Sequence, residues 1–308
     1  MNIEVISIGE FGKQNWDNLC TKYSLTLNYY AYFLDYLAVT YETKNESYVL
    51  LVDDLPSAVV PWFGDLLEVE IPGIVQFKPF DGDDQLIGKF KPEGEKIFNF
   101  EFSTWANNWS YVIPDSIQIQ PFKNLVVDLK SLATSPFTEI SRGHRRTIVR
   151  SMSQGQRTLV IDSASNATDI DFFFDFYRRA HFEAAGRQTR NNQSFELMKQ
   201  YISEGKAILF VAENSGRPRS FLYCDYTNIF SRGWSQANLL DLNQDEYPRH
   251  QLELESMLHF ASIGSIFYHL GQEPLDLTNA TNKERSIFEF KSRFHPLLFE
   301  GYKSLKTV

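Results

Sequence analysis

Two lysines near the C-terminus are placed where an ammonium group could stabilise negative charge. They lie in the stretch TNATNKERSIFEFKSRFHP, residues 278–296, whose apolar residues recur at helical spacing. On this helical wheel Lys283 and Lys291 flank the apolar stripe, whereas Arg285 and Arg293 point away from it. A lysine at the edge of a buried face either extends its ammonium to water or meets an anion. Lys291 and Lys283 are therefore candidates for binding a negative group.

The helix that carries these lysines has recognisable ends. Thr281 is followed three residues later by Glu284, which is the spacing of an N-terminal capping box. Pro296 marks the end of the helix. The stripe predicted to face inward consists of Ile287, Phe290 and Phe294.

Arginine is confined to the second half of the chain. Residues 1–140 hold nine lysines, no arginine and twenty acidic residues, whereas residues 141–308 are close to neutral. The planar guanidinium suits carboxylates and phosphates, so we expect anions to be bound mainly by the second half. The acidic first half argues against a long nucleic-acid partner, because it would repel backbone phosphates.

Several side chains of the second half have suitable chemistry for a general base. His269 has a suitable ordinary pKa, although a histidine on a strand can equally well fill the core. Asp276 and Glu273, in the following loop, are the alternatives. The six histidines include no HxxxH pair, and Cys20 and Cys224 are isolated. The sequence therefore predicts no metal site and two reduced thiols.

The hydropathy pattern predicts a cytoplasmic protein. No apolar run approaches the length of a membrane span, and the first residues, MNIEVISIGE, lack a basic segment followed by an apolar core. The length of 308 residues allows one large domain or two modest ones.

The second half predicts one mixed α/β sheet, because strand patterns alternate with helical ones. The predicted helices are 142–154, 169–185, 195–203 and 249–263, together with the lysine-bearing helix. The predicted strands are 157–162, 207–213, 220–226, 231–240, 265–270 and 297–304, with 122–129 leading into this half.

The first half repeats this pattern loosely. Helical patterns at 13–23 and 28–41 precede a strand–turn–strand pattern at 47–63, as two helices precede the similar pattern at 207–225. The offset of about half the chain predicts a duplicated domain. The expected domains are residues 1–135, degenerate, and residues 136–308, catalytic.

The ordered elements resemble the GNAT acyltransferase fold, and their sequence details resemble its Fem-type branch, in which two GNAT-like domains lie in tandem. The similar segments are NLVVDL, RRTIVRSMSQGQ, AGRQTR, YPRHQLELESMLHFASIGS, YHLGQ and IFEFKSRFHPLL, in this order between residues 124 and 298. Members of the family join an activated acyl group to an amine. Some use aminoacyl-tRNA to extend cell-wall peptides, and others acylate nucleotide-linked amino sugars from acyl-CoA.

Two departures favour acyl-CoA as the donor. The chain has no counterpart of the helical arm of some tRNA-using members, and it lacks the excess of basic residues that tRNA favours. The resemblance then implies an N-acyltransferase that moves an acetyl or other short acyl group to a dTDP- or UDP-linked amino sugar, for O-antigen or other surface polysaccharide. An aminoacyl-tRNA-dependent ligase is the alternative. A non-catalytic binding protein is a third, because the usual QxxGxG pyrophosphate loop is missing.

The resemblance also assigns roles to individual residues. The donor arm would lie along 235–239, with the pyrophosphate at the start of the next helix, so that the donor-binding residues are Gln236, Ala237, Asn238, Arg249, His250 and Gln251. Arg187 and Arg190 would hold the acceptor's diphosphate. Tyr226 and Trp234 are candidates for stacking on a sugar or base. Lys291, beside Phe290, falls at the reaction centre.

Overall fold

The computed structural model describes residues 2–63, 70–77, 97–100, 110–112, 118–239 and 248–304. The chain divides into two compact units, one formed by Met1–Asn124 with Leu298–Val308 and the other by Leu125–Leu297. The division into domains at residue 135 stays a prediction. Within the described ranges, no helix is both long and apolar enough to cross a membrane.

The first unit is built on a five-stranded antiparallel sheet in the order β1-β2-β3-β5-β7. Its strands are β1 (Ile3–Ser7), β2 (Tyr48–Val52), β3 (Leu55–Val60), β5 (Ile74–Gln76) and β7 (Ser110–Val112). The same unit contains β4 (Glu70–Pro72) and β6 (Ile97–Phe100), which pair in parallel.

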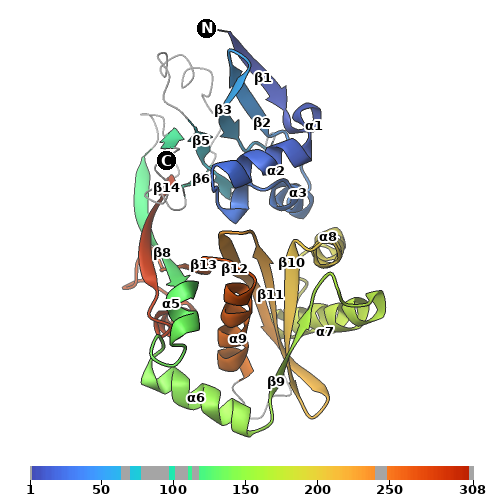
Figure 1. The fold of residues 1–308 in the computed structure, drawn as a ribbon, viewed down its shortest axis with the longest axis vertical. Helices are drawn as coiled ribbons and strands as arrows, with labels where there is room; N and C mark the ends of the chain where they lie inside the picture. Colours follow the sequence, from blue (N-terminus) through green and yellow to red (C-terminus); the bar gives the residue numbers. More distant parts are fainter. Residues whose placement is uncertain are drawn as a thin grey trace. The chain divides into compact units, whose positions relative to one another are not determined.

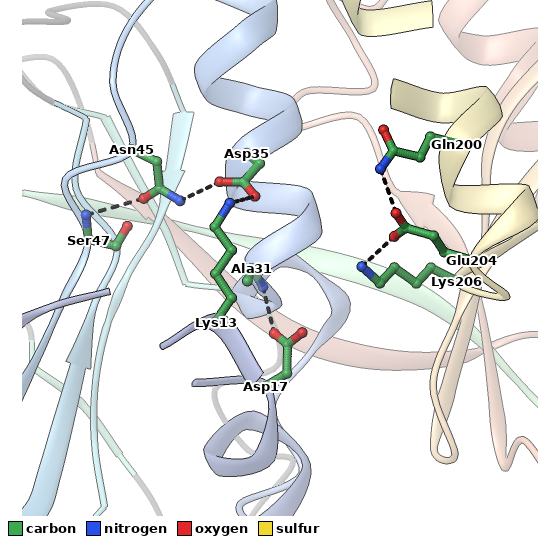
Figure 2. Close-up of polar contacts among 9 residues, drawn as sticks. All are labelled: Lys13, Asp17, Ala31, Asp35, Asn45, Ser47, Gln200, Glu204 and Lys206. Carbon is green, nitrogen blue, oxygen red and sulfur yellow. Dashed lines mark hydrogen bonds and ion pairs between the residues drawn. The ribbon is translucent and has the colours of Figure 1, made fainter. Parts of the chain in front are cut away.

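The helices of the first unit are tied together by buried or charged hydrogen bonds. They are α1 (Ile8–Phe11), α2 (Lys13–Lys22), the 3₁₀ turn η1 (Leu27–Tyr29) and α3 (Ala31–Thr40). The indole of Trp16 donates to the carbonyl of Tyr29 at 2.6 Å. The Asp35 carboxylate accepts from both Lys13 and Asn45, which joins α2, α3 and the segment before β2 (Figure 2).

The second unit contains the strands in the order β13-β12-β11-β10-β9. These are β9 (Arg157–Ile161), β10 (Ala207–Asn214), β11 (Arg217–Tyr226), β12 (Phe230–Asn238) and β13 (Phe267–Gln272). All neighbours are antiparallel except β12 and β13, which are parallel. Two further strands, β8 (Ile119–Asp128) and β14 (Leu297–Ser304), cross the boundary between the units along the chain.

Helices cover both faces of this sheet (Figure 1). The helices of this unit are α5 (Leu129–Thr134), α6 (Arg142–Ser153), α7 (Ala167–Ala185), α8 (Asn192–Ser203), α9 (Pro248–Ser262) and α10 (Asn282–Ser292), of which α7, α8 and α9 pack on the sheet. On one face Leu222 and Cys224 of β11 pack with Leu252 and Met257 of α9 in the main core. On the other face Tyr223 stacks on Tyr177 of α7. We call these the α9 face and the α7 face.

The predicted duplication agrees with the architecture of the two units. In each, a strand is followed by helices and then by a hairpin whose first strand pairs with it, as β1-β2-β3 and β9-β10-β11. Both hairpins turn through two residues with positive φ, Asp53–Asp54 and Ser215–Gly216, as tight hairpin turns require. The parallel pair β12–β13 has no counterpart beside β5, which pairs antiparallel with β3 and β7 in the described residues.

The lysine-bearing helix was predicted correctly at its start but not along its apolar stripe. The capping box between Thr281 and Glu284 is present. Phe290 and Phe294 are buried, whereas Ile287 is 37 % exposed, so its placement in the inward stripe is wrong. The helix contacts the core through its second half, where Phe288 and Phe290 pack, and residues 282–287 lie at the surface.

Candidate active site

The parallel strands β12 and β13 separate part of the way along their length. Their register extends from Phe230 opposite Phe267 to Arg232 opposite His269. Beyond this point β12 continues to Asn238 and β13 to Gln272. In the described residues, the last parts of the two strands therefore have edges that do not pair with each other. Such edges expose backbone N–H and C=O groups that an extended ligand can bind.

A bulge in β12 lies just beyond the point of separation. Tyr223 is opposite Ser235 and Cys224 is opposite Gly233, so Trp234 is the extra residue. Gly233 permits a close approach from the α9 face, because a Cβ at this position would lie 2.6 Å from the Tyr268 hydroxyl. The bulge turns Ser235 toward the α7 face, so adjacent residues of β12 present groups to both faces of the sheet.

A buried hydrogen-bond network lies against Gly233 on the α9 face. The Tyr268 hydroxyl donates to Glu253 Oε1 at 2.9 Å, and Ser256 Oγ lies 3.4 Å from the same hydroxyl. Burial raises the pKa of Glu253, while the Tyr268 hydrogen bond and the positive charge of Lys291 oppose the rise. Neither Glu253 nor Tyr268 was predicted as a site residue. The only signal in the sequence was a glutamate within the predicted helix 249–263.

Lys291 approaches the end of β13 from α10. Its Nζ is so close to Gly271 that a Cβ on this glycine would lie 2.5 Å from it. Burial lowers the pKa of Lys291, and the charge of Glu253 opposes this change. Among the described residues, none forms an ion pair or hydrogen bond with this ammonium. Lys283, in contrast, is exposed on the first turn of the helix.

We expect Gly271→Ala to displace the Lys291 ammonium. The new Cβ would lie 2.5 Å from Nζ and push it away, and the φ of +111° at this position is unfavourable for any residue other than glycine. The acyl transfer that the family resemblance implies should then fall by at least about tenfold, with a modest loss of stability. Kinetic assays beside urea unfolding would measure both. Gly264→Ala is the matched control, because Gly264 also has positive φ but open space around it.

On the α7 face, a buried ion pair marks the last paired position of the two strands. Arg232 donates through Nε and Nη2 to the Asp225 carboxylate at 3.0 and 2.6 Å, and its guanidinium lies 5.3 Å from the Trp234 ring. His269, opposite Arg232, is buried, and its pKa is lowered to about 3 by burial and by the charges of Arg232 and Lys291. His269 is therefore neutral near pH 7.

A second polar cluster connects β12 to the turn after α7. The Ser235 hydroxyl lies 2.9 Å from His181 Nε2 and accepts from Arg190 Nη2 at 3.1 Å. Because arginine only donates, the hydroxyl proton is available to His181. Burial and the charge of Arg190 lower the pKa of His181 to about 4. The structure thus brings Arg190 to the strand of the expected donor arm, while Arg187 lies exposed in the same turn.

The first turn of α9 packs against α6 and α10. The Arg249 guanidinium lies 4.0 Å from the Phe290 ring centroid, and His250 contacts both Phe290 and His144. Gln251 is buried and donates to Glu255 and to the backbone of residue 156. Of the three expected pyrophosphate ligands, Gln251 is thus already engaged within the protein. The residues directly before this turn, 240–247, lie outside the described residues.

The remaining predicted residues are dispersed. Asp276 is exposed and its carboxylate accepts from Thr278 and Asn279, which lowers its pKa. Tyr226 packs against Phe260 on the α9 face, away from Trp234. On β12, Ala237 is buried, Gln236 is partly buried, and Asn238 accepts a hydrogen bond from Ser220 Oγ. Glu273 is partly buried after β13.

Four histidines predict a loss of stability in acid. Burial is the largest cause of the change in each of them. The pKa values of His144 and His181 are lowered to about 4, and those of His250 and His269 to about 3. The unfolded chain takes up these protons near pH 6.5, whereas the folded chain does not. Stability should therefore fall as the pH drops from about 6.5 to about 4, by up to about 1.4 kcal/mol per pH unit for each histidine. Urea unfolding across this window measures the slope of the free energy of unfolding against pH. The variant His259→Gln, which removes a less buried histidine, is the control.

Comparison with known proteins identifies the fold. No family model and no curated protein matches the sequence. Among solved structures, FemX aligns with a TM-score of 0.63 at 11 % identity, covering 98 % of this chain and 97 % of that one. L-PGS from Bacillus licheniformis aligns with a TM-score of 0.58 at 11 % identity, covering 96 % and 92 %. A tandem GNAT protein from the clavulanic acid biosynthesis pathway aligns at 0.52 and 8 % identity, covering 99 % and 98 %. The chain thus has a tandem GNAT-like fold, of the kind seen in FemX.

Proposed function

We propose that the chain is an N-acyltransferase whose active site lies where β12 and β13 separate. The observation that carries this proposal is the combination of the register ending at Arg232–His269 with the Lys291 ammonium held against Gly271. An extended acyl donor can hydrogen-bond to the unpaired edge of β12. A developing negative charge at the end of β13 would meet an ammonium that has no partner among the described residues.

The reaction joins an amine to the acyl carbonyl. The amine nitrogen attacks the carbonyl carbon and gives a tetrahedral oxyanion. The oxyanion collapses to the amide as the bond to the leaving group breaks, and the leaving group departs as an anion that takes up a proton. Lys291 would stabilise the oxyanion, and this stabilisation is strong because its surroundings are poorly solvated. The amine proton needs an acceptor with a pKa near the working pH. Glu253 accepts a hydrogen bond from Tyr268 and its pKa is raised by burial, so it accepts a proton more readily than an ordinary carboxylate, whereas His269, with a pKa of about 3, is a poor acceptor.

We further propose acyl-CoA as the donor and a nucleotide-linked amino sugar as the acceptor. Arg190 is held at β12 through Ser235, and Arg187 is exposed beside it in the same turn, so the turn can bind a diphosphate. Arg249, which is not paired with a carboxylate in the described residues, is the donor-side cation at the start of α9. Its packing on Phe290 orients the guanidinium.

An aminoacyl-tRNA-dependent ligase is the second candidate. This candidate is supported by the likeness to FemX, whose TM-score of 0.63 is higher than the 0.52 of the tandem GNAT protein. A third possibility is a GNAT-like binding protein without turnover.

Calorimetry with CoA, UDP- and dTDP-amino sugars and bulk tRNA, each added alone, distinguishes the three candidates. We expect CoA to bind and Arg249→Ala to weaken it, with Arg217→Ala, on the hairpin turn, as the control. Tight tRNA binding without CoA binding would replace the leading proposal by the ligase. Binding of none of these ligands would leave the non-catalytic protein.

A further inference from the structure

Helix α7 carries aromatic residues on two opposite faces. Its inner face packs into the unit through Ile170, Phe174, Tyr177 and Ala180. Its outer face carries Phe172, Phe176 and Phe182, of which Phe172 is 51 % and Phe182 57 % exposed. A helix that covers a sheet needs only one apolar stripe, so the second stripe indicates a further contact. None of the residues proposed for catalysis belongs to this stripe.

The outer stripe forms one wall of a pocket. The pocket has a volume of about 570 Å³, and its other wall consists of Gln188, Thr189, Asn192 and Phe195. This volume lies within the range of sites that bind small organic molecules. The ring centroids of Phe172 and Phe176 lie 4.9 Å apart, so the two rings form a continuous aromatic surface. A concave site of this size is better suited to binding one small molecule than to binding the flat surface of another protein.

Two arginines in the lining favour the binding of an anion in this pocket. Arg178 and Arg179 line it together with a single acidic residue, Asp175. Asp175 lies 3.8 Å from Arg178 in an exposed pair, which is weak enough for another anion to replace the carboxylate. Arg179 lies 4.5 Å from the centroid of the Phe176 ring and 3.5 Å from Glu183. The lining therefore offers two guanidinium groups beside an aromatic wall, and arginine binds phosphate and carboxylate groups well.

We propose that this pocket binds a single-chain anionic amphiphile, with the apolar chain on the phenylalanines and the phosphate or carboxylate at Arg178 and Arg179. The pocket shares the turn after α7 with the residues proposed for the acceptor, but none of its lining residues has a proposed role in acyl transfer, and binding there does not require turnover. Its ligand is a monomeric molecule, and neither a membrane surface nor a second copy of the chain is the proposed occupant.

Dodecyl phosphate, below its micelle concentration, tests the proposal by titration calorimetry. We expect one molecule to bind per chain, and to bind more tightly than dodecyl maltoside or dodecyltrimethylammonium. The Phe172→Ser, Phe182→Ser double variant should weaken binding at least about tenfold, because it removes two aromatic contacts. Both rings are more than half exposed, so the variant should fold, and thermal unfolding would verify it. Phe137→Ser, at an exposed phenylalanine outside the lining, is the matched control.

The charge preference has its own test. Arg178→Gln with Arg179→Gln should remove the advantage of the phosphate over the maltoside. The proposal is overturned if the phenylalanine variant binds as tightly as the parent, or if the three head groups bind equally. It is also overturned if only vesicles of phosphatidylcholine and phosphatidic acid bind, which would indicate a membrane surface. A dimer in sedimentation that the phenylalanine variant dissociates would make a second copy the occupant.

Discussion

Lys291→Met should reduce kcat/KM for acyl transfer by about a hundredfold to a thousandfold, which is the usual cost of losing one oxyanion-stabilising group. The ammonium lies against Gly271 at the end of β13, and no described residue forms an ion pair or hydrogen bond with it. Methionine keeps the unbranched chain that packs beside Phe290 and removes only the charge. The assay is thiol release from acetyl-CoA in the presence of the acceptor that calorimetry identifies.

Stability should respond differently to this change. Burial lowers the pKa of Lys291, so the folded state disfavours the charged form that exists near neutral pH. Removing the charge should leave the midpoint of urea unfolding unchanged or slightly higher. Lys283→Met, on the exposed first turn of the same helix, is the matched control and should retain activity. Normal turnover by Lys291→Met would restrict α10 to a packing role.

The order of elements could be predicted from the sequence because each depends on local patterns. The predicted helix 169–185 and the predicted strands 207–213 and 220–226 follow from apolar periodicity and turn residues, and the structure has them as α7 and the hairpin β10–β11. The capping box at Thr281 is a local hydrogen-bond pattern and was equally visible. Ile287 was predicted incorrectly, because a helical wheel does not reveal how much of a helix is covered. Coverage depends on the neighbouring elements.

The candidate site was only partly visible in the sequence for the same reason. Lys291 stood out because of its position beside an apolar stripe. Glu253 and Tyr268 meet through a contact between α9 and β13, fifteen residues apart along the chain. Ser235 and His181 meet across fifty-four residues, through a bulge that changes the face on which Ser235 lies. A period-two strand pattern places Ser235 with Gly233, so sequence reasoning could not find this cluster.

The buried ion pair between Asp225 and Arg232 should give the largest effect on stability. The Asp225 side chain is 0 % exposed and that of Arg232 12 % exposed, and the guanidinium binds the carboxylate through two hydrogen bonds. Asp225→Asn leaves the arginine charge without its counter-charge in a poorly solvated place. Removing one partner of such a pair typically costs about 3–5 kcal/mol. Urea unfolding monitored by tryptophan fluorescence measures this loss.

A double variant separates the charge from the packing. Asp225→Asn with Arg232→Met removes both charges, so its free energy of unfolding should lie closer to that of the parent than either single variant does. Strictly additive losses would show that the two side chains act independently and would contradict the ion-pair argument. Arg232 lies opposite His269 at the last paired position of β12 and β13. The single variants should therefore also reduce acyl transfer, because the pair fixes the point from which the two strands diverge.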